Sequence, residues 1–485
     1  MDNLKRIARN TSVLLISQIL GYGLSFFNIM YAARHLGVDG FGVLSFALAF
    51  TAIFGIFMDF GLRLLTVREV ARDKSLAPKY LSNLSAMKFA MCVITFLLIA
   101  ATVSIMGYPD KTVLVVYVIT LAVAMNAFTQ TFYSIFQAFE RMEYQSLGQI
   151  LNGGLLFSGV LVAMKLDFGV TGFAMLYVLS GTACLIYSII ILRIKFSGLY
   201  SDWLKKKIEL DLVFWKETVR EAFPFGLAML FVMIFYWIST VMLSSMKGEA
   251  EVGWYNAAYR IVLVLPVIPQ SLIAAIYPVT SMFYKTSTDS LRMSFEKAFK
   301  YLTIIGVPLG VATTLLSKRI ILLIYGEKYS NSILPLQILA WSAVFIFMST
   351  AFGNLFNSLN RQSIGTKITG VCVLVNVVLN IILIPRLSFI GAGISTLLTE
   401  LVSLFLCFVW SYKIGYAIQG KKLVNIFLRV AASSAVMGFY ITIFHNMNIL
   451  VLIPSATAVY FILLYATRGI DKGDIDLFHS VILRR

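Results

Sequence analysis

The sequence predicts an all-α, polytopic membrane protein with about 14 transmembrane helices, and three observations support this. Of the 485 residues, 59% are hydrophobic and only 13% are charged, whereas a soluble domain has about a quarter of its residues charged. The mean hydropathy is +0.86. The apolar runs are each about 20 residues or longer, which lets a helix cross a hydrocarbon core of roughly 30 Å and is too long for barrel strands.

The apolar runs follow one another along the chain, and each is expected to form one transmembrane helix. They lie near residues 11–33, 41–60, 83–106, 112–136, 147–164, 170–192, 222–246, 254–283, 300–317, 331–358, 365–384, 389–412, 425–444 and 448–467. The first follows a basic segment, as in a signal peptide, but it exceeds the roughly 7–15 apolar residues of an h-region. It is therefore expected to be retained as the first span.

The cysteines predict neither a disulfide framework nor a metal site. All of them fall inside predicted spans, and none has the paired spacing of metal ligands. They are Cys92, Cys184, Cys372 and Cys407. We interpret them as packing residues.

The distribution of Lys and Arg predicts the orientation in the cell membrane, because cytoplasmic loops retain an excess of these residues. Most of the 40 Lys and Arg lie in segments that would be cytoplasmic if the N-terminus were inside, notably 62–80 and 193–220. With an even number of spans, both termini are then cytoplasmic. Topology and anionic lipids explain the net charge of +17, so membrane lipids are expected partners. Nucleic acid is not, because there is no basic soluble domain.

The chain contains an internal repeat with an offset of about 220 residues. The segment "FQAFER" (136–141) aligns with "FNSLNR" (356–361), and "LDFGVTGFA" (166–174) aligns with "LSFIGAGIS" (387–395). Each repeat would hold six spans, and because six is even, the two halves would lie parallel in the membrane. Chance similarity among apolar helices is the alternative interpretation.

The repeat predicts four parts of the chain. Residues 1–200 would form an N-lobe with spans 1–6, and 222–420 a C-lobe with spans 7–12. Residues 201–221 would be a cytoplasmic amphipathic connector, and 421–485 the last two spans and a cytoplasmic tail. Two such lobes can provide alternating access across a membrane.

Several segments resemble a known superfamily. The run "ARHLGVDGFGVLSFALAF…DFGLRLLTVREVAR" (33–72), the run "EVGWYNAAYR…IPQSLIAAIYPVTSMFY" (251–284) and the "NR" after span 10 are similar to the multidrug/oligosaccharidyl-lipid/polysaccharide exporter superfamily. Within it, the chain looks most like the polysaccharide-transporter branch of Wzx-type flippases. The resemblance implies a V-shaped cleft between two six-helix bundles, lined by spans 1, 2, 7 and 8, with two appended helices.

Arg260 is the most informative candidate residue, because it stands alone in a long uncharged stretch of span 8. It lies about six residues from the external end of the span, hence roughly 9 Å deep. An arginine near the bilayer centre costs about 2.5–3.5 kcal/mol even on lenient scales, so it should face protein or water. Its donor fork suits the phosphates of a lipid pyrophosphate. A structural arginine that snorkels to the interface or pairs with a carboxylate is the alternative.

Other polar residues are candidates for lining the same cleft. Asn256 lies one turn before Arg260, and Gln18 and Asn28 belong to a polar stripe along span 1. That stripe is equally compatible with close helix packing. Arg34 and Arg63 close spans 1 and 2, where they are either interfacial anchors or ligands.

Two acidic residues are candidates for gating or ion coupling. Asp59 precedes Arg63 by four residues, which on a helix permits a local ion pair; a gate contact is the alternative. Glu400 stands in the middle of span 12 with no basic residue within one turn. It is either a proton-coupling carboxylate or a neutral group bonded to a neighbouring helix.

The function predicted from these features is a secondary flippase, and not an enzyme, that moves a polyprenyl-(pyro)phosphate-linked oligosaccharide to the external leaflet for cell-surface polysaccharide assembly. No cofactor is expected, since the sequence has no "GxxxxGK[ST]" loop and no metal-ligand cluster. A polysaccharide polymerase or glycosyltransferase is an expected neighbour.

Three alternatives remain open. A cation or multidrug antiporter of the same superfamily would favour an acidic cavity. Lipid II flippases resemble one another in a charged pair in span 1, and "LGYGLSFFN" (20–28) has no charge. A membrane glycosyltransferase or polymerase would need a larger extramembrane catalytic loop.

Overall fold

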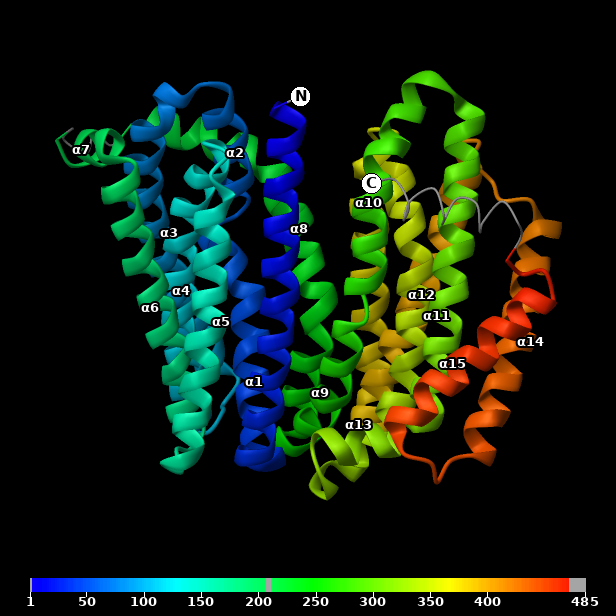
Figure 1. The fold of residues 1–485 in the computed structure, drawn as a ribbon. Coiled ribbons are helices and arrows are strands. Elements are labelled where there is room, and N and C mark those ends of the chain that lie inside the picture. The colour runs from blue at the N-terminus through cyan, green and yellow to red at the C-terminus, as the bar shows by residue number, and fades with distance from the viewer. Residues whose placement is uncertain (1, 206–210, 471–485) are drawn as a thin grey trace. The chain divides into compact units, whose positions relative to one another are not determined.

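The computed structural model describes residues 2–205 and 211–470, and side chains from Leu20 onward apart from those of Tyr22, Asp202, Leu204, Lys205, Ala275 and Pro278. Within these ranges the chain is helical and has no strands, which confirms the predicted fold class (Figure 1). The helices are α1 Asp2–Gly55, η1 Ile56–Met58, α2 Leu62–Arg72, η2 Lys74–Leu76, α3 Ala77–Ile105, α4 Asp110–Ala138, α5 Met142–Lys165, α6 Val170–Lys195, α7 Ser197–Lys205, α8 Leu212–Lys247, α9 Glu249–Val264, α10 Val267–Thr286, α11 Thr288–Ile324, η3 Glu327–Ser332, α12 Ile333–Ser358, α13 Gln362–Lys413, α14 Gly420–Ile443 and α15 Ile449–Ala466.

Among the described residues, 12 helices are long and apolar enough to cross a membrane. Two of them, Gly23–Met58 and Gln362–Lys413, are each interrupted within the helix. Each contains a residue that leaves the helical conformation, Gly37 (φ 68°) in α1 and Ser388 (φ 50°) in α13. Each therefore joins two crossing segments, and the helices account for the roughly fourteen spans expected from the sequence.

The eighth predicted span is two helices rather than one. Helix α9 ends at Val264 and α10 begins at Val267, with Leu265 and Pro266 between them. Proline has no backbone N–H, and its ring clashes with the carbonyl of the preceding helical turn, so it kinks or breaks a helix. The sequence prediction treated 254–283 as continuous because the whole segment is apolar.

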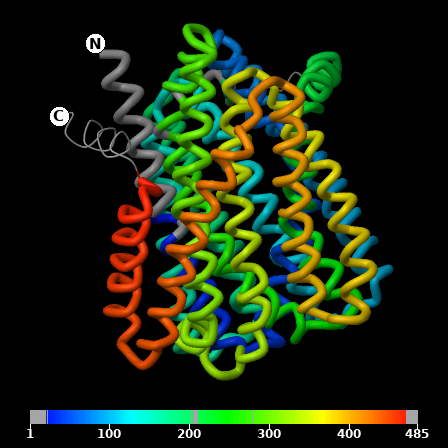
Figure 2. The backbone as a smooth tube through the Cα atoms, turned by 90° about the vertical axis from the view of Figure 1, so that its right-hand side faces the viewer, coloured from blue at the N-terminus to red at the C-terminus, as the bar shows by residue number. Residues whose placement is uncertain are grey.

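The described chain divides into two compact units. The first is formed by Met1–Asn256 with Asn380–Phe389, and the second by Ala257–Leu379 with Ile390–Arg485. In the first unit α1 packs against α4, α5 and α8. In the second α11 packs against α12 and α14, and α14 packs against α15 (Figure 2). Helix α8 packs against α1 and α2 in the first unit. The predicted lobes and their cleft stay a prediction.

Polar contacts at the start of α8 hold it to α2 and α3 within the first unit. Asp211 caps α8 by accepting a hydrogen bond from the Phe214 backbone N–H, 2.9 Å away, and it pairs with the Lys79 Nζ at 2.9 Å. The Phe214 N–H and then the Lys79 ammonium hold the pKa of Asp211 below its usual range. Arg68 of α2 pairs with Glu221 of α8 at 2.5 Å. These contacts explain why α8 belongs to the first unit.

Glycines let α1 approach the first turns of α9 backbone to backbone. A Cβ on Gly42 would overlap the Glu249 carbonyl, and one on Gly253 would overlap the Val38 carbonyl. Close approach at small residues is the usual way in which helices associate in membranes.

The variant Gly42→Ala is therefore expected to lower the free energy of unfolding by about 1–3 kcal/mol, the usual cost of forcing atoms into a packed contact. The control is Gly154→Ala in α5, where a Cβ would meet nothing within 4 Å. Thermal unfolding of both variants in detergent measures the difference. Equal unfolding midpoints would contradict the close packing of α1 on Glu249.

The backbone confirms the internal repeat. Six non-glycine residues in the described part of the chain have positive φ, which is uncommon for such residues. Four of them form two pairs about 220 positions apart, Glu140 (φ 59°) with Asn360 (φ 57°), and Asp167 (φ 52°) with Ser388 (φ 50°). The residue after the first pair closes the same turn in both halves. The backbone N–H of Arg141 and that of Arg361 each donate to the carbonyl five residues earlier, at 2.8 Å. Chance similarity of apolar helices does not produce matched turns.

Candidate functional site

A buried ion pair lies in the first unit. Lys88 of α3 has a side chain only 1% exposed, and its Nζ lies 2.5 Å from Oδ1 of Asp59. The same Nζ donates a hydrogen bond to the Ala127 carbonyl, 2.9 Å away. Met58, Cys92 and Ala127 form a small apolar cluster beside the pair. A charge surrounded by apolar groups is stable there only because it is paired and hydrogen-bonded.

The predicted ion pair of Asp59 with Arg63 is not formed, and that prediction is wrong. Asp59 follows the 3-10 helix η1, and the chain turns at Phe60 (φ 38°) and Gly61 (φ 81°) before α2 begins. Helical i, i+4 stacking therefore does not apply. Arg63 contacts the Asp59 carboxylate through its backbone N–H rather than its side chain, with 3.4 Å from N to Oδ2. Gly61 suits this turn, since a Cβ there would lie 2.8 Å from the Ala222 carbonyl oxygen.

The Arg63 side chain instead begins a hydrogen-bonded chain along α4. Its Nη1 donates to Oε1 of Gln130 at 3.2 Å, and Nε2 of Gln130 donates to Oδ1 of Asn126 at 3.2 Å. Arg63 is half-buried. The guanidinium thus orients two amide side chains, and both of them line a cavity.

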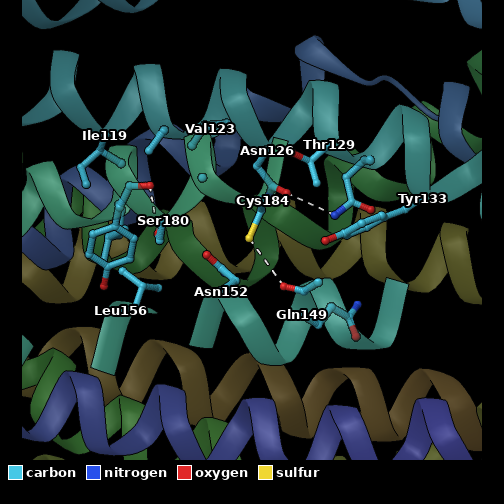
Figure 3. A pocket seen from close by; sticks show the side chains of 16 residues that line it. Ile119, Val123, Asn126, Thr129, Tyr133, Gln149, Asn152, Leu156, Ser180 and Cys184 are labelled. Atoms are coloured by element: carbon cyan, nitrogen blue, oxygen red, sulfur yellow. Dashed lines mark hydrogen bonds between the residues drawn. The ribbon is translucent and has the colours of Figure 1, made fainter. Parts of the chain in front are cut away.

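This cavity lies within the first unit between α4, α5 and α6, and has a volume of about 280 Å³. Figure 3 shows Asn126 of α4 on one side and Asn152 of α5 on the other, with Cys184 of α6 between them. Its polar lining consists of amides, hydroxyls and one thiol: Asn126, Thr129, Gln130, Tyr133, Gln149, Asn152, Tyr177, Ser180 and Cys184. Because no lining residue is charged, the cavity suits neutral hydrogen-bonding groups such as hydroxyls or water.

The structure places the remaining predicted cleft residues in different surroundings. Asn256 is fully buried; its Nδ2 donates to the Val252 carbonyl at 3.0 Å, and its Oδ1 accepts from Thr240 at 3.3 Å. These contacts occupy the amide within α8 and α9. Asn28 is 6% exposed, and among the described residues no group donates a hydrogen bond to its Oδ1. Arg34 is exposed near the Gly37 break, and the side chain of Gln18 lies outside the described residues.

Arg260 is half-buried in α9. Its guanidinium lies within electrostatic range of the buried hydroxyl of Tyr325, the C-cap residue that follows α11 in the same unit. Its role in binding cargo stays a prediction.

Glu400 lies in the second half of α13 and is 5% exposed. Cys372 and Cys407 are close enough to interact with its carboxyl electrostatically. The adjacent Thr399 accepts a hydrogen bond from Nδ2 of Asn376 at 3.1 Å. A coupling role for Glu400 also stays a prediction.

The sequence analysis missed Lys88. It stands eleven residues into α3, about 16 Å along the helix axis at 1.5 Å per residue. The orientation argument counted it with the cytoplasmic lysines, although the same reasoning that selected Arg260 selects a lone cation in "SAMKFAMCV" (85–93).

An all-helical chain with an internal repeat of membrane-crossing helices and buried charges between them defines a polytopic membrane transporter. The sequence model of one family, described as polysaccharide biosynthesis protein, matches residues 7–284, and that of the MatE family matches 224–382. The chain belongs to the polysaccharide biosynthesis protein family, within the multidrug/oligosaccharidyl-lipid/polysaccharide exporter superfamily. The resemblance noted in the sequence is confirmed.

Relatives and solved structures agree with this assignment. The chain is 24% identical over 413 residues to the "Probable low-salt glycan biosynthesis flippase Agl15" of Haloferax volcanii, with 82% of each chain covered. It is 23% identical over 406 residues to the lipopolysaccharide biosynthesis protein WzxC of Escherichia coli K12, covering 81% of this chain and 78% of that one.

Another match covers much less of its relative: an uncharacterised membrane protein of Methanocaldococcus jannaschii is 28% identical, over 44% of this chain and 41% of that one. Among solved structures, the lipid II flippase MurJ in an inward closed conformation is similar in fold, with a TM-score of 0.73, 14% identity, and coverage of 97% of this chain and 99% of that one.

Proposed function

We propose that the protein is a flippase that moves a polyprenyl-(pyro)phosphate-linked oligosaccharide from the cytoplasmic to the external leaflet of the cell membrane by alternating access, for cell-surface polysaccharide assembly. The observation that carries the proposal is the family match over residues 7–284, together with relatives named for glycan flipping and lipopolysaccharide biosynthesis. The internal repeat supports alternating access, since transporters of this kind are built from repeats.

Charge and polarity support the choice of cargo. Arg260 provides a cation for the lipid phosphates, and the cavity of the first unit offers amides and hydroxyls but no charge among its lining residues. Hydroxyl-rich sugars suit such a lining better than organic cations do. In the proposed orientation both termini and the basic loops are cytoplasmic. Membrane lipids and a polysaccharide polymerase or glycosyltransferase are the proposed partners.

Reconstitution into proteoliposomes tests the function. A fluorescent polyprenyl-pyrophosphate oligosaccharide is placed in both leaflets, and a membrane-impermeant quencher reports how fast the inner pool becomes accessible. We expect protein-dependent loss of the protected pool, with protein-free vesicles as the control. A protein that leaves this lipid protected but extrudes ethidium would be a cation antiporter, and one that flips only lipid II would be a lipid II flippase.

A further inference from the structure

A second cavity, of about 350 Å³, lies within the second unit between α11, α14 and the residues that follow α15. Residues at helical spacing line it from two sides, Met293, Glu296, Lys297, Lys300 and Ile304 on α11, and Lys422, Asn425, Ile426, Arg429 and Val430 on α14. This spacing places each set on one face of its helix. Figure 2 shows α14 and α15 running side by side.

The charge in this basic pocket is strongly positive. Among the residues that the structure describes, Lys297, Lys300, Lys422, Arg429 and Arg468 line it together with one carboxylate, that of Glu296. The carboxylate pairs with Nζ of Lys422 at 3.0 Å and is 19% exposed. The described lining therefore has a large excess of cations over acids, and an anion in the pocket would lower their mutual repulsion.

Backbone contacts fix the geometry of the pocket. Arg429 donates from Nη1 to the carbonyl of Arg468, a residue with positive φ (55°) that turns the chain after α15. The backbone beyond α15 is thereby held against α14. The cations are brought together by folding, since those of α11 and those of α14 are more than a hundred positions apart in the sequence.

The surroundings point to a lipid as the source of the anion. Exposed apolar side chains lie nearby on α15, which packs against α14: Ile462 and Tyr465 are each more than half exposed. Met293, which lines the pocket, is 59% exposed. Acyl chains would contact this apolar surface while a headgroup occupies the basic pocket. A free anion would leave it unused.

We propose that the basic pocket binds the phosphate headgroup of an anionic membrane phospholipid. Basic pockets between transmembrane helices on the cytoplasmic side are suited to such headgroups, and in the proposed orientation this pocket faces the cytoplasmic leaflet. The site is separate from the proposed cargo residue Arg260 in sequence and in element. It does not depend on which cargo is transported.

Binding of phosphatidylglycerol to the full-length protein in detergent tests the proposal. Native mass spectrometry and the thermal unfolding midpoint are measured against added phosphatidylglycerol, phosphatidylcholine or inorganic phosphate. We expect selective binding and stabilisation by phosphatidylglycerol, and a loss of affinity of about tenfold to thirtyfold in Lys297→Gln/Lys300→Gln, since each basic residue near a membrane contributes about 1 kcal/mol.

The matched control is Lys367→Gln/Lys413→Gln. It removes the same charge from two residues of the same unit that stack over Trp410, outside the pocket, and should change the affinity less than about twofold. Glu296→Gln should strengthen binding, which keeps the test informative if the lysine variant does not fold.

Equal binding of phosphatidylcholine, equal losses in both double variants, or weaker binding by Glu296→Gln would each overturn the proposal. If inorganic phosphate stabilises the protein as much as phosphatidylglycerol does, the ligand of the pocket is a free anion and not a lipid.

Discussion

Replacing Lys88 by Met is expected to lower the free energy of unfolding by about 3 kcal/mol, because removing one member of a buried ion pair leaves the other charge uncompensated. The Asp59 carboxylate would lose the ammonium 2.5 Å away and keep only 19% exposure to solvent. The Ala127 carbonyl would also lose its donor. The thermal unfolding midpoint in detergent is the measurement. Lys165→Met is the control, since that lysine is exposed at the end of α5 in the same unit.

A double-mutant cycle separates the pair from each residue's other contacts. Asp59→Asn alone leaves the Lys88 ammonium buried, so it should destabilise as well. The double variant Asp59→Asn/Lys88→Met should be more stable than Lys88→Met, since replacing a whole buried ion pair by neutral groups is often close to neutral. A cycle with a coupling energy below about 0.5 kcal/mol would show that the two charges do not stabilise each other.

The same double variant also tests whether the pair acts in transport. If Asp59 is a gate residue, the double variant should fold normally but flip cargo slowly. Without the two charges, the pair would no longer favour one transport conformation over the other. If the pair only stabilises α3 against the turn after η1, recovery of stability should restore flipping.

Local sequence patterns predicted the helices well, because a helix that crosses a membrane needs a long run of apolar residues, and such a run is visible in the sequence. Long apolar runs located the spans, and the aligned segments at 136–141 and 356–361 located the repeated turns. Each of these turns is determined by a few neighbouring residues, and the same turn therefore occurs in both halves, at Glu140 and at Asn360.

Pairing between helices was not predictable in the same way. The expected contact of Asp59 with Arg63 assumed one continuous helix, whereas the chain leaves the helix after Met58 and turns at Gly61 before α2 begins. Asp59 pairs with Lys88 instead. A partner 29 positions along the chain leaves no periodic signal. Asn256 is a similar case, since its position on a helix face was inferred but its hydrogen bond to Thr240 of α8 was not.

Arg260→Ala is expected to reduce flipping of the pyrophosphate-linked glycan by about tenfold to a hundredfold at low substrate concentration. Hydrogen bonds to charged groups contribute about 1.5–3 kcal/mol, and every 1.4 kcal/mol is tenfold in affinity. Arg260→Lys should retain part of the activity, because lysine keeps the charge but loses the planar fork that binds two phosphate oxygens at once. Arg386→Ala is the control, since that arginine is exposed after the predicted eleventh span.

Tyr325→Phe distinguishes a role in cargo binding from a structural one. Arg260 lies within electrostatic range of the Tyr325 hydroxyl. If the guanidinium only supports the end of α11, Arg260→Ala and Tyr325→Phe should lose similar amounts of stability. Both variants should then flip cargo at the parent rate per folded protein. A guanidinium that binds phosphate should instead give a large loss of flipping in Arg260→Ala at little cost in stability, with Tyr325→Phe close to the parent. If Arg260→Ala and Arg260→Lys both flip cargo at the parent rate, the phosphate-binding role of Arg260 is wrong, and the cation for the cargo has to be sought elsewhere in the chain.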